Sequence, residues 1–175
     1  MRFKGIPLVV LLLASCALRP AIAADGIVAD ESTVEAAFLY NFALFTEWPK
    51  LPASEFRFCV MGSDAILAAL ESVKKKQVKE HPVSVTNITS ATQAQSCQVL
   101  FVGRSGHAAI GNLARQIGNA PVLVVSEENG YDPKNVIIVL VAQQGRIAFK
   151  INRTSAIENS LTISSKLLKL AQQVY

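Results

Sequence analysis

The residues best suited to binding chemistry form the run Gly103-Arg104-Ser105-Gly106, between a predicted strand and a predicted helix. Backbone amides and a guanidinium at such a junction can hold an anion, which makes Arg104 and Ser105 candidate anion-binding residues. An ordinary tight turn of small residues explains the same run. The chain contains no Gly-x-Ser-x-Gly nucleophile elbow, phosphate-binding loop or dinucleotide fingerprint.

The other titratable side chains do not combine into a catalytic group. His81 precedes Pro82 in a predicted loop and His107 lies in the first turn of a predicted helix, so we interpret both as surface or capping residues. Neither histidine completes a metal-ligand spacing. Glu127 and Glu128 are adjacent and point differently, which prevents an acid–base pair. The sequence therefore predicts a binding protein with no catalytic residue, no metal site and no cofactor.

The N-terminal segment has the features of a secretory signal peptide. Arg2 and Lys4 precede an apolar run of about a dozen residues, which is too short for an ordinary membrane span. The small-residue pattern Ala-Ile-Ala follows, so we expect a signal peptide at 1–23 and one mature exported domain at 24–175. The stretch Leu-Ala-Ser-Cys, which ends at Cys16, is also typical of a lipoprotein, and anchoring at that cysteine is the alternative.

The charge of the expected mature chain excludes some classes of partner. The formal net charge of the whole sequence is +4, and the leader holds three basic residues and no acidic one. No strong positive field remains to attract nucleic acid or anionic lipid. A chain of about 150 residues is long enough to bury roughly two thirds of its unfolded surface in one domain.

Cysteine usage points to a disulfide. With Cys16 in the leader, Cys59 and Cys97 are left as one possible pair, and an exported chain most simply forms the bond. Closing a loop of about 38 residues stabilises a fold by roughly 4 kcal/mol in the chain-entropy description. Two buried free thiols are the alternative.

The aromatic segment at 32–49 predicts a helix at about 33–47. Ser32 followed by Glu35 is a capping-box pattern, and Pro49 is expected to end the helix. One apolar stripe at helical spacing is expected to be buried, and it comprises Val34, Phe38, Phe42 and Phe45. A core helix explains these aromatic residues, and a helix that also belongs to a partner interface is the alternative.

The rest of the chain alternates apolar strands with amphipathic helices. Strands are predicted at 56–61, 83–85, 98–102, 121–125, 136–141 and 146–151. Helices are predicted at 64–73 with Asp64 as cap, at 106–117, at 153–159, and after Thr162 or Ser164 with Leu167, Leu170, Ala171 and Val174 buried. The order predicts a single α/β domain with a mixed, mostly parallel sheet of about five or six strands. Helices on both faces and a C-terminal hairpin plus helix complete it.

Three groups of motifs, in this order and spacing, resemble the YfiR family of bacterial periplasmic proteins. They are an aromatic helix leading to Trp-Pro at 36–49, Phe-Cys-Val-Met-Gly at 58–62 with Ser-Cys-Gln-Val-Leu-Phe at 96–101, and Phe-Lys-Ile-Asn at 149–152 with the Ser-Lys-Leu-Leu segment at 161–171. The resemblance covers about residues 33–174, and its first and last motifs are specific only in combination.

The resemblance implies a periplasmic regulator without enzymatic activity. Such a protein represses an inner-membrane diguanylate cyclase by binding its periplasmic sensor region, which lowers cyclic di-GMP signalling and affects biofilm formation. A homodimer, and an outer-membrane lipoprotein that relieves the repression, are also implied. Cys59 and Cys97 match the paired cysteines of the family, but a second pair found in its type member is missing here. The residues Lys134-Asn135 also stand where the family tends to have a glycine.

We expect the partner interface on the aromatic helix, at Tyr40 and Trp48, and on the exposed face of the last helix, at Lys166 and Lys169. A regulator that prefers the inactive form of its partner shifts the partner's population to that form. A small-ligand sensor that signals to a histidine kinase or a transporter is the alternative function, and an unrecognised hydrolase is a third.

Overall fold

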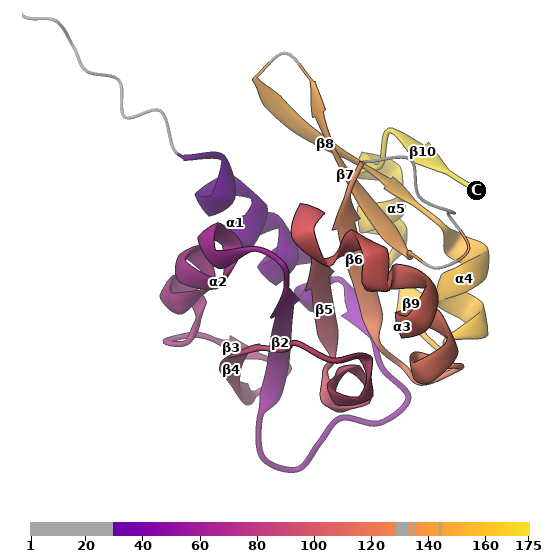
Figure 1. Ribbon diagram of the computed structural model, residues 1–175. Helices are drawn as coiled ribbons and strands as arrows, with labels where there is room; N and C mark the ends of the chain where they lie inside the picture. Colours follow the sequence, from indigo (N-terminus) through magenta and orange to yellow (C-terminus); the bar gives the residue numbers. More distant parts are fainter. Residues whose placement is uncertain (1–29, 129–133, 135, 144) are drawn as a thin grey trace, which may run out of the picture.

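The computed structural model describes residues 30–128, 134, 136–143 and 145–175 (Figure 1). The expected signal peptide, lipidation at Cys16 and the departure at Asn135 lie outside the described residues. A sheet of eight strands forms the centre, in the order β10-β8-β7-β6-β5-β2-β4-β3. Its longer strands are β2 (Phe56–Met61), β4 (His81–Asn87), β5 (Val99–Val102), β6 (Leu123–Glu127), β7 (Ile138–Gln143) and β8 (Arg146–Ile151).

Five neighbouring strands run parallel, in the order β4, β2, β5, β6 and β7. Strand β8 runs antiparallel to β7, as the predicted hairpin requires. All residues of β5 are buried, as expected for a parallel strand that is covered on both faces. The mixed, mostly parallel α/β sheet is therefore confirmed. The predicted number of strands is too low, because several strands have only two residues. Such strands are too short to show an alternating pattern of apolar and polar residues in the sequence. These are β1 (Thr46–Glu47), β3 (Gln77–Val78), β9 (Thr162–Ile163) and β10 (Gln173–Val174).

Helices cover both faces of the sheet and enclose two hydrophobic cores. One face carries α1 (Glu31–Leu44), α2 (Asp64–Leu70) with its continuation η1 (Glu71–Val73), α4 (Arg153–Glu158) and α5 (Ser165–Leu170). The other face carries η2 (Ala91–Ser96), η3 (Arg104–Ala109) and α3 (Ile110–Ile117). Successive residues of a strand point to opposite faces, so Phe101 belongs to the first core and Leu100 to the second.

A disulfide ties the second core to the centre of the sheet. Cys59 lies in β2 and Cys97 follows η2, and the structure joins them with their Cα atoms 5.9 Å apart. Both residues are fully buried in the core beneath α3. The bond therefore fixes the short η2 helix, which has few residues of its own to hold it, against the middle strand.

The aromatic helix differs from its prediction at both ends. Helix α1 begins at Glu31 after Asp30, and the hydroxyl of Ser32 donates to Asp30 instead of forming the capping box with Glu35. The helix ends at Leu44, ahead of Pro49, because the next residues pair with β9 as strand β1. The predicted stripe is also wrong in part. The buried face of α1 consists of Glu35, Ala36, Leu39, Phe42 and Ala43. The sequence did not indicate this face, because a helix with apolar residues on most of its surface has no single apolar stripe.

The C-terminal helix is shorter than predicted. It ends at Leu170, and the chain then forms β10, which pairs parallel to the outer edge of β8. Of the four side chains expected to be buried, only Leu167 is, while Leu170 is 70% exposed. Helix α2 is capped by the hydroxyl of Ser63, which accepts from the Ile66 amide, and not by Asp64.

Candidate functional site

The loops after β2 and β5 meet at the point where the order of the parallel strands reverses. The chain leaves β2 for β4 on one side and returns to β5 on the other, and α/β sheets bind ligands at the carboxyl ends of strands at such a switch point. Gly62 has a φ of +76°, and a Cβ there would lie 2.2 Å from the Gly106 amide nitrogen. The Gly103 amide donates to the Met61 carbonyl at 2.8 Å. The two loops therefore interlock through glycine backbone.

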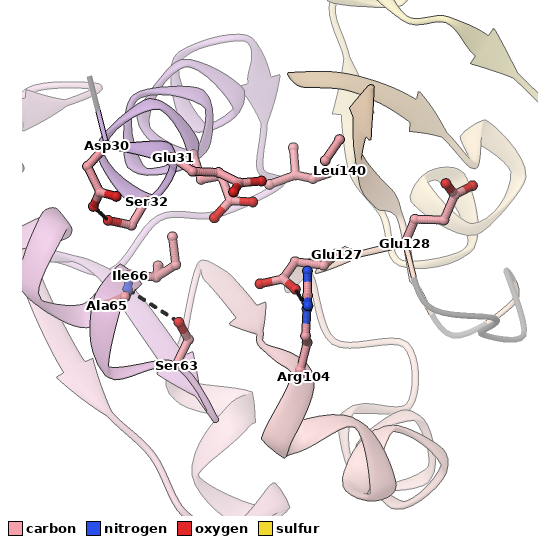
Figure 2. A pocket seen from close by; sticks show the side chains of 12 residues that line it. Asp30, Glu31, Ser32, Ser63, Ala65, Ile66, Arg104, Glu127, Glu128 and Leu140 are labelled. Atoms are coloured by element: carbon pink, nitrogen blue, oxygen red, sulfur yellow. Dashed lines mark hydrogen bonds and ion pairs between the residues drawn. The ribbon is translucent and has the colours of Figure 1, made fainter. Parts of the chain in front are cut away.

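A cleft of about 450 Å³ opens at this edge of the sheet (Figure 2). The first turn of α1, the start of α2, the end of β6 and strand β7 form its walls, together with Arg104 of η3. Five of its lining side chains are carboxylates and one is basic. The lining residues are Asp30, Glu31, Ser32, Glu35, Ser63, Ala65, Ile66, Arg104, Glu127, Glu128, Leu140 and Ala142.

Ion pairs neutralise one side of the cleft only. The Arg104 Nε atom donates to Glu127 Oε2 at 2.6 Å, and the Lys150 Nζ atom lies 2.5 Å from Glu128 Oε1. Across the cleft, the carboxylates of α1 and its cap, Asp30, Glu31 and Glu35, form no ion pair with any side chain of the described residues. The wall formed by α1 is therefore an unneutralised acidic surface.

Glu35 is the most unusual of these carboxyl groups. Its residue is only 8% exposed, yet it lines the cleft and has no hydrogen-bond partner among the described residues. Burial, with smaller contributions from the carboxylates of Glu127, Glu31 and Asp30, raises the pKa of Glu35 to about 7 against the opposing effect of Arg104. The cleft therefore holds a carboxyl group that changes charge near neutral pH.

The substitution Glu35→Gln is expected to flatten the pH dependence of stability. Because the pKa of Glu35 is raised from 4.5 to about 7 on folding, the unfolded chain loses this proton first as the pH rises. The wild-type free energy of unfolding should therefore fall between those values by about 1–2 kcal/mol more than that of the variant, after allowance for screening in the cleft. Urea unfolding at about pH 5 and pH 8 measures this difference. An equal fall in the free energy of unfolding between the two pH values in both proteins would contradict it.

The expected interface residues of the aromatic helix lie largely within the fold. The Tyr40 hydroxyl donates to the Gln77 carbonyl at 2.9 Å, and the Lys76 ammonium lies 4.6 Å from the centre of the Tyr40 ring. Trp48 packs edge-on against Phe56, with ring centres 5.0 Å apart. Both aromatic side chains are half-buried, so each retains only part of its surface for a partner.

The last helix carries the more open surface. Lys166 and Lys169 are exposed on α5, and Leu170 beside them is 70% exposed. Ile157 of α4 is the next most exposed of the large apolar side chains among the described residues, at 62%. The C-terminal part of the chain thus presents apolar groups together with basic ones.

Comparison with known proteins assigns the chain to a family. A family model described as YfiR/HmsC-like matches residues 32–172. This protein belongs to the YfiR/HmsC-like family. The family consists of periplasmic regulators, and it is known for regulation and not for catalysis. Within the described part of the chain, no helix is long and apolar enough to cross a membrane.

One solved structure supports the fold of this YfiR/HmsC-like chain. It is the crystal structure of a conserved domain protein from Vibrio cholerae O1 biovar El Tor, with a TM-score of 0.57 and 14% sequence identity. The match covers 83% of this chain and 60% of that chain, so the present chain spans about three fifths of that chain's length. The comparison with curated proteins finds no significant match.

In this YfiR/HmsC-like protein, the surroundings of the candidate anion-binding residues Arg104 and Ser105 are acidic. Arg104 is held by Glu127 in a cleft dominated by carboxylates, and the Ser105 hydroxyl donates to the Gly62 carbonyl at 2.8 Å. The electrostatics therefore favour a cation over an anion. Sequence reasoning missed Glu35, which it interpreted as a capping residue. The available signal was its position, an acidic residue among the apolar residues of a buried helix.

Proposed function

We propose that this protein is a non-enzymatic periplasmic regulator that represses an inner-membrane diguanylate cyclase by binding the cyclase's periplasmic sensor region. Cyclic di-GMP signalling is lowered as a result. The observation that carries the proposal is the match of residues 32–172 to the YfiR/HmsC-like family. The Cys59–Cys97 bond supports it, because disulfides persist in an oxidising compartment such as the periplasm. Export by the signal peptide at 1–23 is part of the same proposal.

Repression requires only that the regulator bind one form of the cyclase better than the other. A ligand with equal affinity for both forms shifts nothing, and moving an equilibrium from mostly active to mostly inactive takes about 5 kcal/mol of preference. No catalytic group is needed on the regulator. An outer-membrane lipoprotein that competes for the same surface would reverse the shift.

We place the main contact with the cyclase on the exposed face of α5. Interfaces combine an apolar centre with a polar rim, and Leu170 with Lys166 and Lys169 offers that combination. The two lysines favour a partner surface that is acidic. The exposed parts of Tyr40 and Trp48 are secondary candidates, and a homodimer stays a prediction of the family resemblance.

The double substitution Lys166→Glu with Lys169→Glu is expected to weaken binding to the cyclase's sensor region about tenfold or more. Both lysines are exposed, so the fold should be unaffected, while the reversed charge opposes an acidic partner surface. Co-purification of the exported protein with the membrane cyclase, followed by titration of the purified sensor region, measures the loss. The charge-matched control is Lys74→Glu with Lys75→Glu, at the exposed end of η1. Equal binding by both double variants would remove α5 from the interface.

A small-ligand sensor that signals to a histidine kinase or a transporter is a second candidate. The observation in its favour is the cleft of about 450 Å³ at the switch point of the sheet, a volume within the usual range for small-molecule sites. A thermal-shift screen that finds no stabilising small molecule would count against it.

A further inference from the structure

We propose that the acidic cleft at the carboxyl edge of the sheet binds a small organic cation that carries two amine or guanidinium groups and no carboxylate. The site consists of Asp30, Glu31 and Glu35 on one wall and Glu127 and Glu128 on the other (Figure 2). The inference does not depend on the proposed repression of a cyclase, because it concerns the isolated protein.

The first argument is the unsatisfied carboxyl group of Glu35. Glu35 has no ion-pair partner among the described side chains, and its carboxyl oxygens are not enclosed in the core but open to the cleft, so they depend on what the cleft contains. It is nine-tenths buried and its residue lines the cleft. An ammonium or guanidinium group in the cleft would supply both the missing charge and the missing donors.

The second argument is the distribution of charge around the cleft. Among its lining residues Arg104 is the single base, and Glu127 already occupies it, whereas the carboxylates of the α1 wall have no cationic partner in the described chain. The walls contributed by α2 and β7 hold no ionisable lining residue. The unpaired carboxylates of the α1 wall favour one cationic group, and a second cationic group of the same ligand can reach the opposite wall by competing with Arg104 for Glu127 or with Lys150 for Glu128. A ligand carboxylate would be repelled there.

The third argument separates an organic cation from a metal ion. No group of three or more metal-ligating side chains converges anywhere in the described residues, so the carboxylates are spread around the cleft without forming a coordination shell. The cleft volume of about 450 Å³ is far larger than an ion requires and suits an elongated small molecule.

Binding should be linked to the ionisation of Glu35. The groups that face it are Asp30 and Glu31 from α1 and its cap, Glu127 from β6 and Arg104 from η3. Their effect is already part of the raised pKa of Glu35 in the protein without ligand. A cation binds the ionised form, so affinity should rise as the pH rises through 7. Arg104 competes with the ligand for Glu127, so its removal should strengthen binding.

Isothermal titration of the exported protein with putrescine and with agmatine at low ionic strength tests the proposal. We expect saturable binding at about pH 8, about tenfold weaker at about pH 6, and at least tenfold weaker for butylamine, which has one amine. Glu35→Gln should weaken diamine binding about tenfold and abolish its pH dependence, while Arg104→Ala should strengthen it. The control Glu71→Gln removes an exposed carboxylate outside the cleft and should bind like the wild type.

The folded state of each variant is checked by its thermal unfolding in the same buffers. Absence of diamine binding at millimolar concentration and pH 8 would overturn the proposal. Binding that Glu35→Gln leaves unchanged, or that Arg104→Ala weakens, would overturn it as well. Preferential binding of phosphate or succinate would show instead that Arg104 serves an anion.

Discussion

The double substitution Cys59→Ala with Cys97→Ala should lower the free energy of unfolding by about 3–4 kcal/mol. The bond closes a separation of 38 residues and joins β2 to the end of η2 inside the second core. Without it the unfolded chain gains conformational freedom, and η2 keeps the packing of its short apolar face and the hydrogen bond from the Gln95 side chain to the Gln116 carbonyl. Cys59 and Cys97 are the only cysteines among the described residues, so here the whole effect rests on one pair. Denaturant unfolding under non-reducing conditions measures the loss.

A reductant supplies the matched control for this prediction. Dithiothreitol should destabilise the wild-type protein by a similar amount and leave the double variant unaffected. If reduction changes neither protein, or if peptide mapping without reductant finds free thiols at Cys59 and Cys97, the bond does not form in the exported protein and the account of its stability fails.

Gly62→Ala is expected to destabilise the protein by more than about 3 kcal/mol and to distort the cleft. The added Cβ would lie 2.2 Å from the Gly106 nitrogen, which is backbone and cannot move aside like a flexible side chain. The φ of +76° adds strain of its own. The Gly62 carbonyl also accepts from the Ser105 hydroxyl, and the next residue, Ser63, caps α2, so both loops at the switch point should shift.

Gly118→Ala separates backbone strain from collision. Gly118 has a φ of +55°, but a Cβ there would meet nothing within 4 Å, so only the strain of about 1–2 kcal/mol is expected. Thermal and urea unfolding of the two variants side by side gives the comparison. Equal losses would mean that the interlocked loops relax freely, which contradicts the rigid switch point described above.

The central strands could be predicted from the sequence because each is an apolar run bounded by turn residues. Strands such as β5 and the hairpin of β7 and β8 appear close to their expected positions. The two-residue strands could not be predicted, since they exist only through a neighbour: β10 forms where the chain meets the edge of β8, and β1 where it meets β9. The early end of α1 and the exposure of Leu170 both follow from these pairings.

The acidic cleft could not be predicted from the sequence for a similar reason. Its carboxylates come from residues 30–35 and 127–128, which are far apart in the chain and meet only because the first turn of α1, a helix packed on one face of the sheet, reaches the carboxyl ends of the parallel strands. Arg104 was recognised as a candidate, but the partner that occupies it, Glu127, is a tertiary neighbour. The sign of the preferred ligand charge therefore had to come from the structure.

Cellular cyclic di-GMP in a strain that lacks the gene tests the proposed repression most directly. We predict a rise of about threefold or more on deletion, since removing the regulator returns the cyclase to its active population. The wild-type gene should restore the original level, whereas the Lys166→Glu, Lys169→Glu variant, exported in equal amount, should not. An unchanged cyclic di-GMP level in the deletion strain would contradict the proposal that this protein represses a diguanylate cyclase.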